Sequence, residues 1–329
     1  ELLSTNMILA VGFNTTDNPV IELKMKQAAE AGAKVVLVNP EDYVQHIDFL
    51  NKAVYTKNDL SFLKEVARAV VDSGRGAGVD GYEEFAASVK DVTVSDDAKA
   101  VADMYLEAKK AMIVFNQNLI TTEAASLLAD IALVSGHIGT PRDGILQVKA
   151  KNNSQGLVDL GITAGAEELE GVKALVVFGE EADIDTDALE FLAVSDTHMT
   201  ALAAKADVVI PGTGFASTDG TYTNTERRLQ LVQAAIEEDV ELANWEIAAE
   251  IAHVFEVDYE WENTEDISVA MNDEVPAYKY AVLGGVLKPA DDARLAVIGD
   301  AKFADPIKCT DSLMNVIVER LPKPANPTA

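Results

Sequence analysis

The sequence predicts an α/β protein with two Rossmann-like αβα lobes, in which helices cover both faces of mostly parallel sheets. Three observations indicate this class. Short apolar runs alternate with longer segments of helical periodicity, the pattern of parallel strands joined by crossover helices. Hydrophobic residues make up 48% of the chain but aromatic residues only 6%, which is typical of Ala- and Leu-rich helices packed on Val-rich strands. The chain is also long enough, at 329 residues, for two domains with separate cores.

The chain opens with a βαβ unit. We expect a buried strand over 7–11, a turn from Gly12 to Thr16, an amphipathic helix over 20–31 and a second strand over 34–38. The turn precedes the N-terminus of a helix, where anions are favoured. It lacks the G-x-G-x-x-G pattern, so the usual dinucleotide fingerprint is absent.

The rest of the first half predicts further helices and one central strand. The helices are expected over 60–71, 82–89, 95–110 and from Thr121 or Thr122 to 133, and the strand over 111–115. Ser95 is the expected N-cap of its helix. The glycine-rich run 73–78 follows no predicted strand and lacks the Lys-Ser/Thr of a P-loop. A flexible link is therefore favoured over a phosphate loop.

The second half predicts strands over 172–178, 191–194 and 208–210, the last of them buried, and a helix that includes 245–254. A loop rich in glycine and hydroxyl residues follows over 217–224 and ends on Glu226, Arg227 and Arg228. Open α/β sheets bind ligands beyond strand ends, and Thr, Asn and Arg groups can bind phosphates or polar heterocycles. An ordinary turn with a solvated Arg pair accounts for the same residues, and the residues alone leave both interpretations open.

Composition excludes several classes of partner. The net charge of −29 argues against nucleic acid and anionic membranes. No apolar run reaches the ~18–20 residues of a membrane span and no signal peptide precedes the first strand, so we expect a cytoplasmic protein without membrane insertion. The single cysteine excludes a four-cysteine iron–sulfur cluster from this segment. The four histidines lack metal-ligand spacing and no hydrolase motif is present, so we assign no metal ligand and no catalytic residue.

Two segments carry a family resemblance. ADVVIPGTGFASTDGTYTNTERRLQ, over 206–230, resembles the signature of the molybdopterin oxidoreductase superfamily. That family includes formate dehydrogenase alpha subunits and the large iron–sulfur subunit of NADH:quinone oxidoreductase. SGHIGTPRDGILQVKAKNNSQGLVDLGI, over 135–162, resembles the link that crosses between the family's lobes beside the pterins. Side-chain amides suit that position because pterins present paired donors and acceptors.

The resemblance implies a set of cofactor-binding residues: Gly12, Asn14, Asn152, Asn153, Gln155, Gly156, Asp196, Thr221, Thr223, Asn224, Arg227 and Arg228. Asp196 resembles the acid that holds the guanine end of the family's dinucleotide. Three residues depart from the pattern. Asn39-Pro40-Glu41 stands where the family has Asp-Pro-Arg, and Ala201 where Glu is common. The acid and the Arg that are lost at Asn39 and Glu41 put full cofactor binding by the first lobe in question.

The resemblance also implies the domain organisation. We expect a first lobe over 1–149, a second lobe with the TNTERR loop over 150–257, and an extension over 258–329 that is too short for the family's C-terminal barrel. The family's metal ligand, catalytic His and iron–sulfur segment lie upstream of residue 1. We therefore expect a fragment that is inactive alone.

Two functions follow from the resemblance. The first is the pterin-binding core of a formate dehydrogenase-like oxidoreductase in an electron-transfer complex. It would bind molybdopterin guanine dinucleotide with Mo or W, and iron–sulfur or flavin subunits would be its partners. The alternative is a scaffold region without cofactor, like the large iron–sulfur subunit of NADH:quinone oxidoreductase. The sequence leaves both open.

Overall fold

The computed structural model describes residues 1–45, 47–116, 118–149, 151–162, 169–179, 181–182, 184–237, 240–257, 259–275, 278, 283 and 309–311. These residues form two compact units. Unit 1 contains residues 1–156 together with 223–227, and the other described residues belong to unit 2. The sequence analysis placed 223–227 in the second lobe. This segment instead packs with unit 1, because its backbone and side chains bond to residues there, as detailed below.

The core of unit 1 is a five-stranded parallel sheet in the order β3-β2-β1-β4-β5, which confirms the predicted fold class. Its strands are β1 (Met7–Val11), β2 (Lys34–Pro40), β3 (Lys52–Thr56), β4 (Ala111–Asn116) and β5 (Gly144–Val148). Every residue of β1 and β4 is buried, as expected for central strands covered on both faces. The sequence analysis missed β3 and β5.

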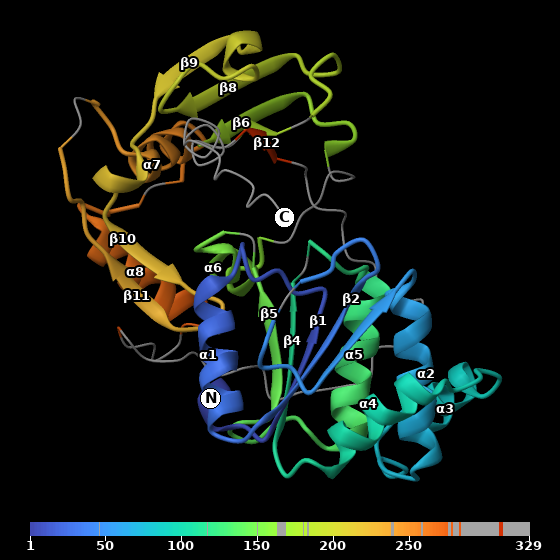
Figure 1. Cartoon of the computed structure of the whole chain (residues 1–329). Coiled ribbons are helices and arrows are strands. Elements are labelled where there is room, and N and C mark those ends of the chain that lie inside the picture. The colour runs from blue at the N-terminus through green and yellow to red at the C-terminus, as the bar shows by residue number, and fades with distance from the viewer. Residues whose placement is uncertain are drawn as a thin grey trace, which may run out of the picture. The chain divides into compact units, whose positions relative to one another are not determined.

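Helices cover both faces of this sheet (Figure 1). One face packs against α2 (Asp59–Asp72), α4 (Asp96–Glu107) and α5 (Thr122–Ser135), with α3 (Tyr82–Val89) beside α2. The other face packs against α1 (Pro19–Glu30) and the short 3-10 helix η1 (Leu2–Ser4). Alternate residues of β1 supply the two cores, because successive side chains of a strand point to opposite faces.

Local chemistry fixes the ends of these helices. The Ser95 hydroxyl accepts a hydrogen bond from the backbone N–H of Ala98 at 3.3 Å, which confirms the predicted N-cap of α4. The Thr121 hydroxyl caps α5 in the same way. Gly76 lies in the run expected to be a flexible link, but a Cβ there would approach the carbonyl oxygen of Val134 to 2.5 Å. At Gly76 that run therefore packs against α5.

Unit 2 contains a smaller parallel sheet in the order β6-β8-β9. Its described elements are α6 (Ser154–Asp159, which begins in unit 1), β6 (Ala174–Phe178), β7 (Glu181–Ala182), β8 (Phe191–Asp196), η3 (Ala203–Lys205), β9 (Val208–Pro211), η4 (Phe215–Ser217), β10 (Gly220–Thr223), β11 (Leu229–Val232), α7 (Asn244–Val254), α8 (Thr264–Glu274) and β12 (Cys309–Asp311). β9 is an edge strand, and Val208 and Val209 are each about two-fifths exposed. The expectation that this strand is buried was wrong, and among the described strands only β8 pairs with it.

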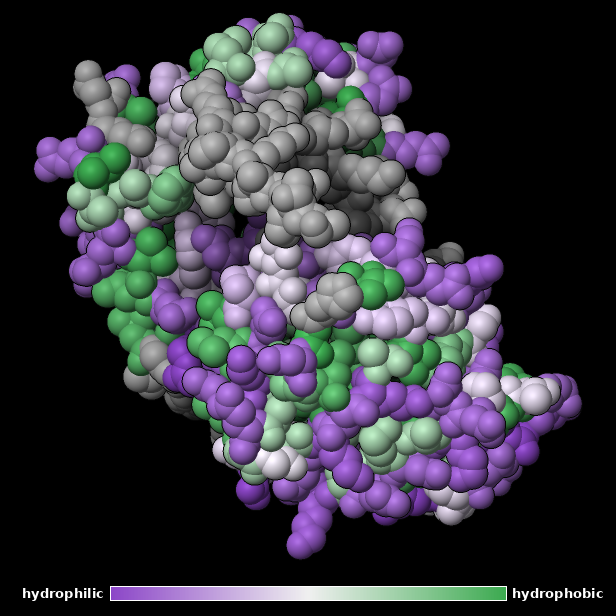
Figure 2. Space-filling view, in the orientation of Figure 1, coloured by the Kyte–Doolittle hydropathy of each residue, from purple (hydrophilic) through white to green (hydrophobic). Residues whose placement is uncertain are grey.

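The hydropathy of the surface agrees with these buried cores. Hydrophilic residues predominate over the lower part of the face in Figure 2, which belongs to unit 1, and smaller hydrophobic areas interrupt them. Among the described helices, none is long and apolar enough to cross a membrane.

Candidate cofactor-binding site

Gly12 follows β1 at the carboxyl edge of the unit 1 sheet. Its N–H donates to the carbonyl oxygen of Val38 at 2.9 Å, and its φ of 56° lies in the left-handed region. A Cβ at this position would come within 2.5 Å of the Ile120 side chain. Both the backbone conformation and the close approach therefore require glycine here. Protein atoms, rather than open space, lie against this glycine.

Asn39 occupies the end of β2, where the family resemblance leads one to expect an acid. Its Oδ1 accepts from the backbone N–H of Phe13 at 2.9 Å, and its Nδ2 donates to the Phe13 carbonyl oxygen at 3.0 Å. The Gln45 side chain also donates to that carbonyl oxygen, and its Oε1 accepts from the N–H of Thr15 at 2.9 Å. Asn39 is buried. The backbone after β1 is thus hydrogen-bonded to two side-chain amides of the protein.

Asn14 follows in the same loop and is half-buried. Its Nδ2 donates to Asp17 Oδ2 at 2.6 Å, and its Oδ1 accepts from the N–H of Thr16 at 2.8 Å. These are the local bonds of an Asx turn. The structure therefore places Asn14 beside Gly12 at the strand edge, and its amide stabilises the loop that precedes α1.

The link and the TNTERR loop meet within unit 1. Asn153 Oδ1 accepts from the backbone N–H of Thr223 at 2.9 Å, and the backbone N–H of Lys149 donates to the Thr225 hydroxyl at 3.3 Å. Gly156 lies under the Asn153 amide, because a Cβ there would be 2.3 Å from Asn153 Oδ1. Predicted site residues far apart in sequence, Asn153, Gly156 and Thr223, are thereby brought together. We call this contact the link–loop junction.

The loop itself has a defined conformation. Asn224 Oδ1 accepts from the N–H of Glu226 at 3.0 Å, and its carbonyl oxygen accepts from the N–H of Arg227 at 2.8 Å. The Glu226 carboxylate pairs with Lys24 of α1 at 2.8 Å. Arg227 has a φ of 58°, which is uncommon for a residue with a side chain and is often found at functional sites. Thr223 is buried and Arg227 is half-buried, so the loop is held by the protein before any ligand binds.

The remaining predicted site residues are distributed over both units. Asn152 is exposed and Gln155 half-buried, and both lie beside the junction in sequence in unit 1. Thr221, Arg228 and Asp196 belong to unit 2, where the first two are half-buried. The structure therefore groups the candidates into a unit 1 set and a unit 2 set.

Asp196 ends β8 at the carboxyl edge of the unit 2 sheet. Its Oδ1 accepts from the N–H of Thr197 at 2.6 Å and lies 3.6 Å from His198 Nδ1. Beside it, Gly179 follows β6 with a φ of 60°, and its N–H donates to the carbonyl oxygen of Ser195 at 2.8 Å. Gly179 is exposed, so its backbone is accessible to a ligand, and an acid at the end of the adjacent strand can accept hydrogen bonds from a nucleoside.

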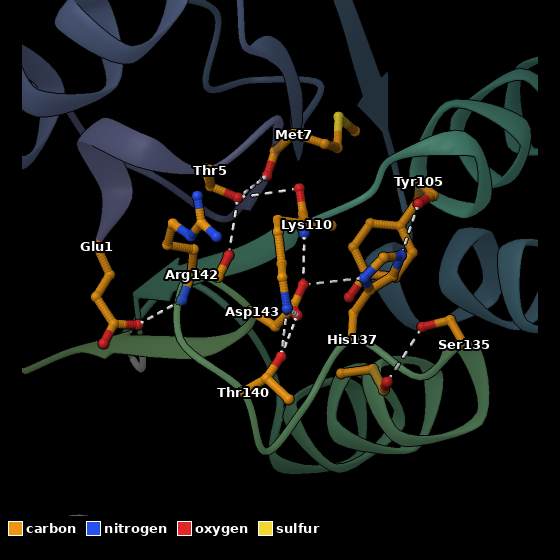
Figure 3. A network of polar contacts seen from close by, with 12 residues as sticks. Glu1, Thr5, Met7, Tyr105, Lys110, Ser135, His137, Thr140, Arg142 and Asp143 are labelled. Atoms are coloured by element: carbon orange, nitrogen blue, oxygen red, sulfur yellow. Dashed lines mark hydrogen bonds and ion pairs between the residues drawn. The ribbon is translucent and has the colours of Figure 1, made fainter.

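A buried polar network lies at the opposite, amino edge of the unit 1 sheet (Figure 3). Asp143 accepts from Lys110 Nζ at 2.6 Å, from the Thr140 hydroxyl at 2.6 Å and from the Ala111 N–H at 2.9 Å. His137 contacts Asp143 Oδ1 through Nδ1 at 3.1 Å. Burial raises the pKa of Asp143, but the hydrogen bonds from Lys110, Thr140, Ala111 and His137 outweigh it and lower that pKa to about 2.

This network shows what His137 does in the segment 135–162, which resembles the family's link. Its second ring nitrogen, Nε2, lies 3.0 Å from the carbonyl oxygen of Tyr105, so both nitrogens face protein acceptors. The ring packs edge-on against Tyr105, whose pKa is raised by burial. His137 and Asp143 therefore join α4, α5 and the starts of β4 and β5. Sequence reasoning missed this role because Lys110 and Asp143 lie far apart in the chain.

These features agree with the comparisons. The chain belongs to the molybdopterin oxidoreductase family, and its residues 1–254 match the sequence pattern of that family. It is 23% identical over 340 residues to "Formate dehydrogenase H" of Escherichia coli (strain K12), covering 81% of this chain and 47% of that protein. It is 25% identical over 346 residues to "F420-dependent formate dehydrogenase subunit alpha" of Methanocaldococcus jannaschii, covering 83% and 51%. The chain thus spans about half the length of the curated relatives it matches.

A solved structure supports the fold alone. Acetylene hydratase from Pelobacter acetylenicus aligns with a TM-score of 0.61 at 13% identity, over 81% of this chain and 50% of that one. The family implies a molybdopterin cofactor with Mo or W. Gly179 with Asp196 in unit 2 fits the nucleotide end of such a group, because it combines accessible backbone with a carboxylate acceptor. The cofactor contacts of the individual residues stay predictions.

Proposed function

We propose that this chain is the pterin-binding core region of a formate dehydrogenase-like molybdopterin oxidoreductase. The observation that carries the proposal is the link–loop junction, in which the Asn153 amide holds the backbone of Thr223. The two segments joined there are the two that resemble the family signature. A loop fixed in this way presents its Asn and Arg groups without a large ordering cost on binding.

The cofactor in this proposal is molybdopterin guanine dinucleotide with Mo or W. When bound, it supplies a metal that exchanges electrons with the substrate. The chain's own residues bind and orient it. Asp196 accepts hydrogen bonds from the nucleoside end, and Arg227 and Arg228 carry the positive charge that suits phosphates. Asn152 and Gln155 offer paired amide donors and acceptors to the pterin.

The proposed setting is a multi-subunit electron-transfer assembly. The Methanocaldococcus jannaschii relative is described as a subunit alpha. We propose iron–sulfur or flavin subunits as partners of this chain and formate as the first substrate to test. The cytoplasm is the proposed location.

A second candidate is a scaffold region without cofactor, like the large subunit of NADH:quinone oxidoreductase. The observation that favours it is Asn39, whose amide is bonded to the protein where an acid is expected. The comparisons reported above concern formate dehydrogenases and do not specifically support this alternative.

The test is metal and pterin analysis of the native full-length protein that contains this chain. Elemental mass spectrometry measures Mo and W, and fluorescence of oxidised pterin measures the organic part. We expect stoichiometric metal and pterin in the native protein. The Asp196→Asn variant should retain less pterin, and Asp185→Asn, which changes an exposed carboxylate of the same unit, should retain the native amount. Absence of metal and pterin, in cells that load other molybdoenzymes, would refute the proposal and favour the scaffold.

A further inference from the structure

The two units repeat the same strand-edge arrangement. In unit 1, the last residues paired between β1 and β2 are Val11 and Val38, and Gly12 and Asn39 follow them. In unit 2, the last residues paired between β6 and β8 are Phe178 and Ser195, and Gly179 and Asp196 follow them. The two glycines have φ values of 56° and 60°. Each donates its N–H to the carbonyl oxygen of the residue just before the polar one, at 2.9 Å in unit 1 and 2.8 Å in unit 2. The two edges are therefore equivalent in backbone geometry.

Their side chains differ, and in unit 1 the edge is closed. The space against Gly12 is filled, because a Cβ there would be 2.5 Å from the Ile120 side chain and 3.1 Å from that of Leu119. Asn39 is only 1% exposed, and both ends of its amide bond to the backbone of Phe13. A ligand would have to displace the 119–120 segment and break both of these bonds.

A second amide closes the same edge. Gln45 donates to the Phe13 carbonyl oxygen and accepts from the N–H of Thr15. The Tyr55 hydroxyl donates to the Gln45 carbonyl oxygen at 3.2 Å, which fixes the position of that residue. The backbone groups that could bind a nucleotide after β1 are thus already paired. Leaving them unpaired would cost free energy, since buried polar groups need partners.

The unit 2 edge is open at the corresponding position. No described atom lies within 4 Å of a Cβ placed on Gly179. Asp196 bonds to the backbone through Oδ1, and no hydrogen bond joins its Oδ2 to any of the described residues. Its side chain is only 8% exposed. This carboxylate oxygen can therefore accept a hydrogen bond from a ligand, and the hydroxyl or amino hydrogens of a nucleoside supply one.

We propose that the chain takes the nucleotide end of a ligand at only one of these two equivalent edges. In unit 2, Gly179 and Asp196 bind it. In unit 1, the side-chain amides of Asn39 and Gln45 form the hydrogen bonds with the backbone after β1 that a nucleotide would otherwise form. The identity of the ligand rests on the proposed function. The inequality of the two edges rests on the geometry of this chain alone.

The test is calorimetric titration of the 329-residue chain with GMP in ~0.15 M salt, which screens repulsion by the acidic surface. We expect one binding site. Asp196→Asn should weaken GMP binding about tenfold to a hundredfold, because a charge-assisted hydrogen bond is lost. Asp185→Asn in unit 2 and Asp17→Asn, beside the unit 1 edge, should bind GMP like the unchanged chain. Hydrogen exchange with GMP should protect the ends of β6 and β8 and leave those of β1 and β2 unchanged.

Three outcomes would overturn the inference: two equivalent GMP sites, protection at the end of β1, or no GMP binding by the folded chain. Its failure can be told apart from failure of the proposed function. A native protein without metal or pterin whose chain still binds one GMP at unit 2 refutes the function only. A native protein with metal and pterin whose chain binds GMP at both edges refutes this inference only.

Discussion

Replacing Asp143 by Asn removes the charge that joins β4, β5 and two helices at the amino edge of the unit 1 sheet. The native carboxylate is 2% exposed and accepts hydrogen bonds from Lys110, Thr140 and Ala111. Its pKa falls from an ordinary value of 3.8 to about 2. Each pKa unit corresponds to ~1.4 kcal/mol, so ionisation of Asp143 contributes about 2 kcal/mol to stability.

We expect Asp143→Asn to lower the free energy of unfolding of unit 1 by about 2 to 4 kcal/mol. This loss of stability is near the low end of that expected when a buried ion pair is broken, because the Lys110 side chain is 25% exposed and can be rehydrated. The assay is urea unfolding at pH 7, with hydrogen exchange of β4 amides to assign the transition to unit 1. Asp103→Asn is the matched control. It breaks the exposed Lys99–Asp103 pair and should leave the free energy of unfolding almost unchanged.

The same variant has a predicted pH dependence. The pKa of Asp143 is lower in the folded than in the unfolded chain, so its contribution is present above about pH 4 and is lost as pH falls toward 2. The difference in stability between the native chain and Asp143→Asn should therefore shrink over that range. A loss below 1 kcal/mol at pH 7, or a difference that stays constant between pH 5 and pH 2, would refute the reasoning.

Three further changes test other parts of unit 1. Gly12→Ala should destabilise unit 1 by more than about 1 kcal/mol, because Gly12 has a positive φ and the space for a Cβ is already filled. In the control Gly78→Ala, the added Cβ meets no described atom, so the stability should change little. Equal effects of the two substitutions in thermal unfolding would contradict this. Thr121→Ala should cost about 1 kcal/mol through loss of the α5 N-cap, and an unchanged urea midpoint would count against it. Lys24→Met and Glu226→Gln, combined in a double-mutant cycle, should show a coupling below about 1 kcal/mol that decreases in high salt, because the pair is partly exposed. A salt-independent coupling would contradict that account.

Much of unit 1 could be predicted from sequence because its signals are local. The strand over 7–11 and the helix over 82–89 have the predicted bounds, and Ser95 is the N-cap of α4. Apolar periodicity and helix caps depend on neighbours within one or two turns, so they can be read without the fold. β5, in contrast, was hidden inside a segment interpreted as a link, and its strand state depends on pairing with β4.

The candidate site was predictable only as a set of residue types. The resemblance identified the TNTERR loop and the link, but it could not show that Asn153 holds Thr223. It marked Asn39 as a departure without showing what the amide does. It assigned no role to His137, which bonds to Asp143 and Tyr105. In each case the deciding partner is distant in sequence, so no local pattern contains it.

The sequence by itself determined the α/β class, the family and most of the unit 1 elements, because these follow from periodicity, caps and motifs within short stretches. Only the tertiary structure decided that 223–227 packs with unit 1, that the edge at Gly12 is filled by Ile120 and Asn39, and that no described atom fills the space beside Gly179. The physical reason is that hydrogen-bond satisfaction and close packing are properties of residues that meet in space. Two edges with the same backbone geometry can therefore differ in what they bind.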